Sequence, residues 1–241
     1  MSLLKIPVLL ISSVLVWKAF TPPRLPPSPP AEKVQAQPGG IEQFVGYFVP
    51  YQAYIYKVQF CFGSLCEIAW IIACNSWQWA HLHPFFSTLK EHGDPTTPVG
   101  ITPQFAIGTS LIIAGAVLRI VCYRVLGKQF TFVLQLRDKH QLITAGPYAY
   151  VRHPSYTGLF SLYAGCALVL FGDGSWFREG SWLNSSVGVA WVSIWVLMRT
   201  VETINILVRT VSEDRFLKDR FGDQWERWAA KTQYRIVPFI F

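Results

Sequence analysis

The side chains best suited to chemistry are concentrated in residues 140–158, which hold two histidines, three tyrosines and an arginine around a Gly146-Pro147 pair. Imidazole, phenol and guanidinium groups supply hydrogen-bond donors, and a Gly-Pro pair favours a turn that gathers them. Recognition of a nucleotide-like cofactor needs such a set of groups. Aromatic rings and a snorkelling arginine also occur at ordinary membrane interfaces, so the residue types alone leave both interpretations open.

A second candidate feature is the pair Arg209 and Glu213, which stand four residues apart in a helical pattern. Residues at this spacing share one helix face, so both side chains can point into one pocket. Most pairs of this kind are solvated surface pairs. A functional role is favoured here because both segments are predicted to lie on the same side of a membrane.

The elements that must position these residues are predicted to be membrane helices. Of the 241 residues, 51% are hydrophobic and 15% are charged, and the mean hydropathy is +0.30. Apolar runs approach the length of about 20 residues that a spanning helix needs. The sequence therefore predicts an all-α integral membrane protein, a multispanning bundle of about five helices, with spans at 1–20, 58–80, 104–124, 155–172 and 183–199.

The predicted organisation has four parts. These are an N-terminal transmembrane helix (1–20), a Pro-rich linker (21–43), membrane helices (44–124), and a region with the last two spans and C-terminal amphipathic helices (125–241). Whether 44–57 spans the membrane is left open, and so is the role of Glu67, which should face protein, water or one end of its span. Phe221-Gly222 predicts a helix end, and Asp223 with Glu226 predicts a capping box for a further helix.

The net charge of +7 indicates orientation in a bilayer rather than nucleic-acid binding, because the lysines and arginines lie between apolar runs and in the tail. Their distribution places 125–154 and the tail after Arg199 on the cytosolic side. The five cysteines lie in apolar segments and are interpreted as small buried hydrophobes. His81, His83 and His92 lack an evident fourth ligand, so no metal site is expected.

Three stretches together resemble the isoprenylcysteine carboxyl methyltransferase family: residues 140–158, the Arg209…Glu213-Asp214 spacing, and the ending 221–238. The resemblance covers roughly the second half of the chain. It implies a helix bundle, here in the endoplasmic reticulum membrane, with a cytosolic cofactor pocket formed by a loop and the C-terminal helices. It also implies methyl transfer from S-adenosylmethionine to the C-terminal carboxylate of a prenylated cysteine.

The resemblance also implies roles for individual positions. Arg209 would be the catalytic and substrate-binding residue that meets the acceptor carboxylate. Gln135 matches a family glutamine only if a two-residue gap is allowed. The cofactor contacts implied by the resemblance are Gln135, His140, Gln141, Leu142, Ile143, Tyr148, His153, Pro154, Ser155, Tyr156 and Glu213.

Other functions share parts of this pattern. Phospholipid N-methyltransferases have the same core motif, but an amine acceptor must lose a proton and so needs a base. Sterol reductases have a similar C-terminal ending but bind NADPH, whose phosphates require several cationic side chains. Residues 140–156 hold one arginine and no lysine, which disfavours this function. A non-catalytic membrane protein is the remaining alternative.

Overall fold

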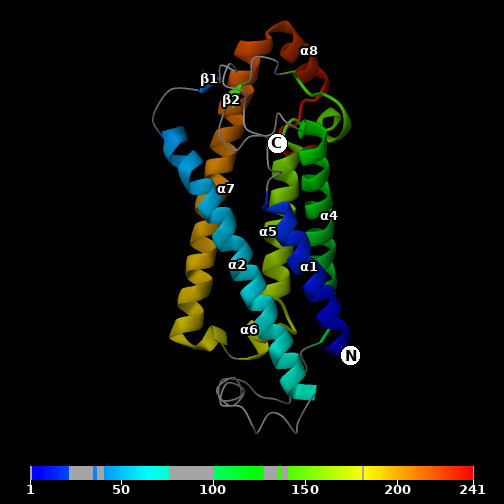
Figure 1. Cartoon of the computed structure of the whole chain (residues 1–241), viewed down its shortest axis with the longest axis vertical. Coiled ribbons are helices and arrows are strands. Elements are labelled where there is room, and N and C mark those ends of the chain that lie inside the picture. The colour runs from blue at the N-terminus through cyan, green and yellow to red at the C-terminus, as the bar shows by residue number, and fades with distance from the viewer. Residues whose placement is uncertain are drawn as a thin grey trace. The chain divides into compact units, whose positions relative to one another are not determined.

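The fold is an all-α bundle of long helices (Figure 1), seen in a computed structural model that describes residues 2–21, 35–36, 41–75, 100–127, 135–136, 141–180 and 182–240. The longer helices are α1 (Lys5–Ala19), α2 (Ile41–Asn75), α4 (Pro103–Leu126), α5 (Pro154–Phe171), α7 (Ser186–Phe221) and α8 (Asp223–Lys231). Single turns are η1 (Ser2–Leu4), η3 (Gly146–Ala149), α6 (Trp176–Glu179) and η4 (Trp182–Asn184). Two-residue strands β1 (Gln35–Ala36) and β2 (Gln135–Leu136) pair antiparallel.

Four segments in the described part of the chain are long and apolar enough to cross a membrane: Tyr51–Ile72, Pro103–Leu126, Pro154–Glu179 and Ser186–Phe221. The predicted all-α membrane fold is therefore confirmed. With 15 residues, α1 is shorter than the usual span, so the count of about five stays a prediction.

Two helices differ from their predicted bounds. The span predicted at 58–80 belongs to α2, which begins at Ile41, continues through Pro50 and ends at Asn75. Residues 44–57 are thus part of a long helix. The span predicted at 183–199 continues without a break to Phe221, so the last span and the tail helix are one element, α7. The polar residues after Arg199 did not end the helix because no Gly or Pro follows until Gly222.

The chain divides into two compact units. Unit 1 holds residues 1–17, 56–114 and 161–201, and unit 2 holds 18–55, 115–160 and 202–241. In unit 1, α4 and α5 approach closely: a Cβ added at Gly165 would lie 2.6 Å from the carbonyl oxygen of Gly108. In unit 2, a Cβ at Gly158 would lie 2.8 Å from the carbonyl oxygen of Gly115. Glycine at these positions lets the two backbones touch, as in many membrane helix pairs.

Glu67 faces protein, one of the three placements that the sequence left open. In unit 1 its carboxylate forms an ion pair with the ammonium of Lys5, and both side chains are at most 2% exposed. Lys5 also donates to the carbonyl oxygen of Gly174, 2.9 Å away. A charge in an apolar interior is costly unless it is paired, so this contact accounts for Glu67 inside a span.

Unit 2 joins α1, α4 and α5 through Arg119, which is 5% exposed. Its guanidinium donates to the carbonyl oxygens of Ala19 at 2.9 Å and Ser155 at 3.0 Å. The hydroxyl of Tyr123 donates to the same Ala19 oxygen at 2.6 Å. These bonds satisfy carbonyls at the end of α1 and fix the first turn of α5, where the candidate site begins.

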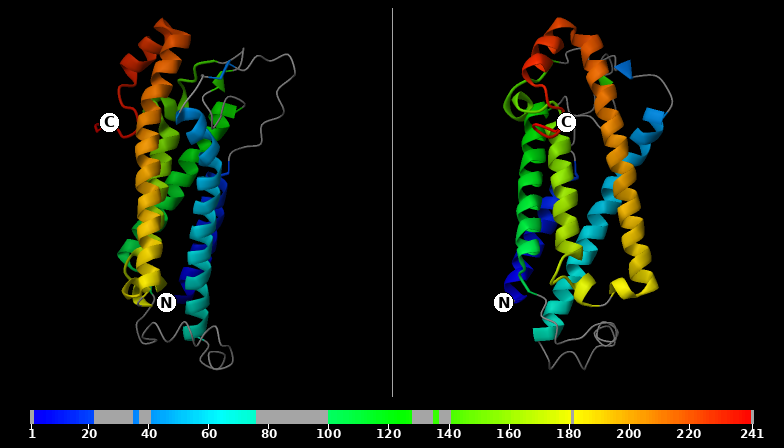
Figure 2. Two further views of the ribbon diagram at one scale, coloured as in Figure 1. Left: turned by 90° about the vertical axis from the view of Figure 1, so that its left-hand side faces the viewer. Right: turned by 180° about the vertical axis from the view of Figure 1, so that it is seen from behind.

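Helix α8 begins after a sharp turn at Gly222, whose φ of +49° is uncommon for other residues. The predicted capping box is wrong: Gly222 is the N-cap residue, Asp223 is the first helical residue, and no side chain caps the helix. The indole nitrogen of Trp228 donates to the carbonyl oxygen of Tyr148 at 3.0 Å. This bond docks α8 on η3 (Figure 2).

Candidate functional site

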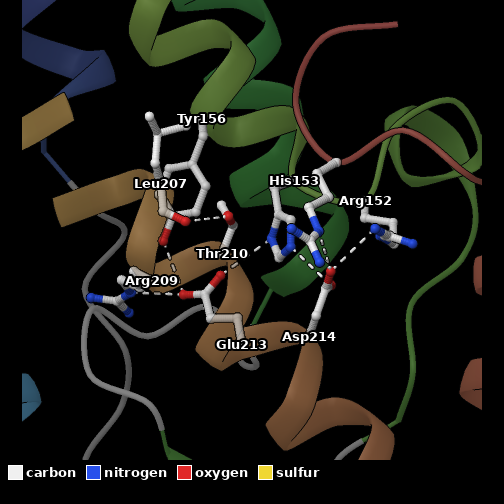
Figure 3. A network of polar contacts seen from close by, with 9 residues as sticks. Arg152, His153, Tyr156, Leu207, Arg209, Thr210, Glu213 and Asp214 are labelled. Atoms are coloured by element: carbon white, nitrogen blue, oxygen red, sulfur yellow. Dashed lines mark hydrogen bonds and ion pairs between the residues drawn. The ribbon is translucent and has the colours of Figure 1, made fainter. Parts of the chain in front are cut away.

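The candidate site lies in unit 2, where the start of α5, the last third of α7 and the segment after α8 meet. Two backbone hydrogen bonds join these parts: the amide of Arg152 donates to the carbonyl oxygen of Tyr234 at 2.9 Å, and that of His153 to Arg235 at 2.7 Å. Side chains from all three segments then form one polar network (Figure 3). The fold thus brings together the two features that the sequence singled out.

Glu213 is the first centre of this network. One of its carboxylate oxygens, Oε1, accepts from Arg209 Nε at 2.7 Å and from the Tyr156 hydroxyl at 2.9 Å. Its other oxygen, Oε2, lies 3.2 Å from His153 Nδ1 (Figure 3). Three of the residues predicted for the site therefore converge on a fourth. The side chains of Arg209 and Glu213 remain 16% and 18% exposed, so both can still be reached by a ligand.

His153 lies between two carboxylates. Its Nε2 is 3.0 Å from Asp214 Oδ1, and its Nδ1 faces Glu213. Burial of the ring disfavours its charged form, but the hydrogen bonds and charges of Asp214 and Glu213 outweigh burial and raise the pKa of His153 above its ordinary value. Only an imidazolium can donate from both nitrogens at once. The two carboxylates therefore favour the charged form of the ring.

Asp214 is the second centre of the network, and the sequence analysis did not assign it a role. Its Oδ2 lies 3.0 Å from Arg235 Nε and 3.2 Å from an Arg152 terminal nitrogen. The signal in the sequence was its position directly after Glu213, and in the structure Asp214 is buried, as is Thr210 four residues before it. Arg152 and Arg235 were likewise not assigned, although each lies within a stretch that carries the resemblance.

Among the residues that the structure describes, the network holds more cationic than anionic side chains. Arg152, Arg209, Arg235 and the imidazolium of His153 stand against the two carboxylates of Glu213 and Asp214. The carboxylates hold the cations in place, and a cluster of cationic side chains favours an anion nearby. A guanidinium is well suited to hold a ligand carboxylate in a defined orientation. The arrangement can therefore bind and aim an anionic group at the edge of the membrane.

Other predicted residues lie in a neighbouring apolar cluster. Leu142 and Ile143 pack against a core formed by Cys122, Tyr148 and Trp228. Burial raises the pKa of the Tyr148 phenol, so that group is neutral. This cluster ties η3 to α4 and α8, and it lies next to the network rather than within it.

The remaining predicted positions are placed as follows. Gln141 is exposed, Pro154 is buried at the start of α5, and Ser155 is half-buried with its carbonyl held by Arg119. The backbone of Gln135 lies in β2, and its side chain is outside the described part of the chain. His140, His81, His83 and His92 are also outside the described residues. Within the described residues, no group of three His, Cys, Asp or Glu side chains could hold a metal ion.

The chain is similar to known proteins over its central part. Residues 106–176 match the model of the isoprenylcysteine carboxyl methyltransferase (ICMT) family. This segment contains nearly all of α4, all of α5 and the motif from Tyr148 to Gly158. It ends before Arg209 and Glu213.

Several curated proteins are similar over a longer stretch. A probable protein-S-isoprenylcysteine O-methyltransferase of Oryza sativa subsp. indica is 30% identical over 56% of this chain and 61% of its own length. Protein-S-isoprenylcysteine O-methyltransferase B of Arabidopsis thaliana is 28% identical over 65% of this chain and 66% of its own length. The protein-S-isoprenylcysteine O-methyltransferase of Rattus norvegicus is 31% identical over 58% of this chain and 43% of its own length. The match thus spans less than two thirds of each of these relatives. The family resemblance seen in the sequence is confirmed.

Proposed function

Taking the similarity to isoprenylcysteine carboxyl methyltransferases as premise, we propose that this chain uses S-adenosylmethionine to methylate the C-terminal carboxylate of a prenylated cysteine. The acceptors are lipidated proteins whose CaaX ends have been processed. The proposal places the protein in the endoplasmic reticulum membrane, with the network around Glu213 facing the cytosol. The family match over 106–176 and the basic residues after Arg199 support it.

The observation that carries the proposal is the partly exposed guanidinium of Arg209 beside Glu213 in a network that also holds Arg152 and Arg235. A prenylcysteine ends in a carboxylate that is already ionised at neutral pH. A half-buried guanidinium can hold that carboxylate, while the ion pair at 2.7 Å restrains the arginine side chain. No general base is needed, because the attacking oxygen carries no proton.

Three of the residues proposed to hold the methyl donor, His153, Tyr156 and Glu213, are in contact in unit 2. The donor would supply a methyl group activated on a sulfonium, and the new bond from that carbon to the carboxylate oxygen would replace its bond to sulfur. Opposite charges are neutralised in this displacement, so a site that excludes water favours it. His153, Tyr156 and Glu213 would meet the donor's polar groups, whereas Leu142 and Ile143 would offer apolar surface. The other proposed contacts are Gln135, His140, Gln141, Tyr148, Pro154 and Ser155.

An amine acceptor fits the network less well. Phospholipid N-methylation requires a base close to the donor, and Glu213 is the carboxylate that could serve. Its two oxygens already accept from Arg209, Tyr156 and His153. Three donors stabilise the carboxylate anion and make it a weak base. The network therefore favours an acceptor that is already an anion.

The experiment is incubation of the purified protein in lipid nanodiscs with methyl-labelled S-adenosylmethionine and two acceptors, a prenylcysteine analogue and phosphatidylethanolamine. We expect base-labile label, the signature of a methyl ester, only with the prenylcysteine. Label in phosphatidylethanolamine would replace the proposal with the phospholipid alternative. Absence of both products together with absence of donor binding in calorimetry would favour a non-catalytic membrane protein.

A further inference from the structure

The segment after α8 is fixed at the depth where a membrane span begins. Residues 234 and 235 accept hydrogen bonds from Arg152 and His153, which immediately precede the candidate span starting at Pro154. The Thr157 hydroxyl, one turn into that span, donates to the carbonyl oxygen of Ile236. Figure 2 shows the red tail returning from α8 to the start of α5. Residue 236 is thus level with the first turn of the span.

The next residues form a turn that presents two apolar side chains outward. The amide of Ile240 donates to the carbonyl oxygen of Val237 at 3.2 Å, which closes the turn. Phe239 is 87% exposed and Ile240 is 81% exposed, whereas Ile236 just before them is 1% exposed. One side of the segment is therefore anchored in unit 2, and its other side is a compact apolar tip.

We propose that turn 237–240 is an interfacial membrane anchor, whose partner is the boundary between headgroups and acyl chains of the surrounding bilayer. Two observations favour lipid over a protein partner. The residues that lead directly into the turn, 234–236, are bonded to residues at the start of a span, so the depth of the turn is that of the interface. The apolar tip consists of two adjacent side chains, which is large enough to insert among lipids but small for a stable protein interface.

The anchor has a consequence for the candidate site. The segment that leads into the turn also supplies the Arg235 side chain, 3.0 Å from Asp214, and the carbonyls that hold the Arg152 and His153 amides. Burial of Phe239 and Ile240 in lipid would hold this segment against α5. The anchor thus keeps the network assembled, without touching a substrate or the methyl donor.

Fluorine NMR of the full chain in nanodiscs tests the anchor directly. p-Trifluoromethylphenylalanine is placed at Phe239, at exposed Gln224 on α8 as a water reference, and at Ile113, 46% exposed in the span of α4, as a lipid reference. Line broadening by a water-soluble gadolinium chelate should be weak at 239 and 113 and strong at 224. Dissolved oxygen, which concentrates in lipid, should give the reverse order. Equal broadening by the chelate at 239 and 224 would overturn the proposal.

A second measurement tests the consequence for the site and needs no enzyme activity, so it is independent of the proposed function. The variant Phe239→Ser/Ile240→Ser should show several-fold faster amide exchange in peptide 150–157, which contains the His153 amide. The control Val187→Ser/Val189→Ser removes two other exposed apolar side chains and should leave this peptide unchanged. Unchanged exchange in the Phe239/Ile240 variant would show that the turn does not hold the segment.

Discussion

At the scale of single residues, Arg209 and Glu213 form one ion pair, and the proposed function gives each of them a different partner. Both side chains are about one sixth exposed, and their contact is 2.7 Å. In the proposed function, Arg209 meets the acceptor and Glu213 meets the donor. Substitution of either residue therefore disturbs the other through their shared bond, and a double-mutant cycle is needed to separate the two effects.

We expect Arg209→Lys and Glu213→Gln to fail in different ways. Lysine keeps the charge but replaces the planar fork with a single ammonium, so kcat with the prenylcysteine should fall by roughly a hundredfold while donor binding survives. Glu213→Gln removes an anionic partner of the donor's positive groups and should raise the apparent KM for S-adenosylmethionine. Steady-state kinetics with both substrates varied measures the two effects. Near-normal turnover of Arg209→Lys would remove the carboxylate-binding role.

His153 gives the network a defined pH dependence. Burial opposes the charge on the ring, but Asp214 and Glu213 outweigh it and raise the pKa of His153 in the folded protein. The imidazolium therefore contributes stability that is fully present below the unfolded pKa of about 6.5 and is lost as pH rises through the higher folded value. The thermal midpoint in detergent should fall across this window. His153→Gln should flatten that part of the profile, and an unchanged profile would show that the ring is not held as a cation.

At the scale of elements, the N-terminal helix is part of the bundle because it carries the counter-ion of Glu67. Lys5 at the start of α1 pairs with a carboxylate inside α2, and both groups are almost fully buried. Removing one partner would leave the other as an uncompensated charge among apolar side chains. The pair thus fixes α1 against α2 inside unit 1.

Lys5→Met should lower the free energy of unfolding by about 3–5 kcal/mol, because Glu67 loses its partner. Adding Glu67→Met should restore much of that loss, since two buried apolar side chains replace the pair. Lys18→Met on the same helix is the control, because Lys18 is exposed. Thermal unfolding in detergent ranks the four proteins. A double variant as unstable as Lys5→Met alone would show that the cost comes from packing rather than charge.

The sequence predicted the helices better than their contacts. The apolar runs predicted the bounds of α4 and α5 to within a residue or two, because each helix begins at a proline, Pro103 or Pro154. The last span was predicted to end at Arg199, whereas α7 continues to Phe221. Its second half is rich in charged residues, but it also carries Thr210 and Asp214, which are buried in unit 2. Local patterns do not show which distant side chain a buried charge will meet. Glu67 was therefore recognised as costly in lipid, but its partner Lys5 was not identified.

In the candidate site too, the sequence predicted local pairs of residues but not contacts between distant segments. Spacing alone indicated that Arg209 and Glu213 share a face, and the structure brings them into contact. The roles of Asp214 and Arg235 depend on the return of the chain from α8 to α5, which no local pattern encodes. A single sequence does not identify residues whose role depends on contacts with distant parts of the chain, even when the motif around them can be recognised.

At the scale of the whole molecule, the account requires both halves of the network to face the same aqueous compartment. Unit 2 already places Arg152, His153 and Arg235 in contact with Asp214. Single cysteines at exposed positions Tyr150 and Lys231 should therefore react with an impermeant maleimide from the cytosolic side of sealed microsomes. A lumenal resident protein controls for leakage. Labelling of one position but not the other would remove the proposed arrangement.

The central claim is that the acceptor is a carboxylate on a prenylated cysteine. Its most direct test compares N-acetyl-S-farnesylcysteine with the corresponding carboxamide, using the purified protein in nanodiscs and labelled S-adenosylmethionine. The two acceptors have the same lipid and backbone and differ in the group that Arg209 would hold. We predict a base-labile methyl ester from the acid and no labelled product from the amide. Equal methylation of both acceptors, or no ester from the acid by protein that binds the donor, would contradict the account.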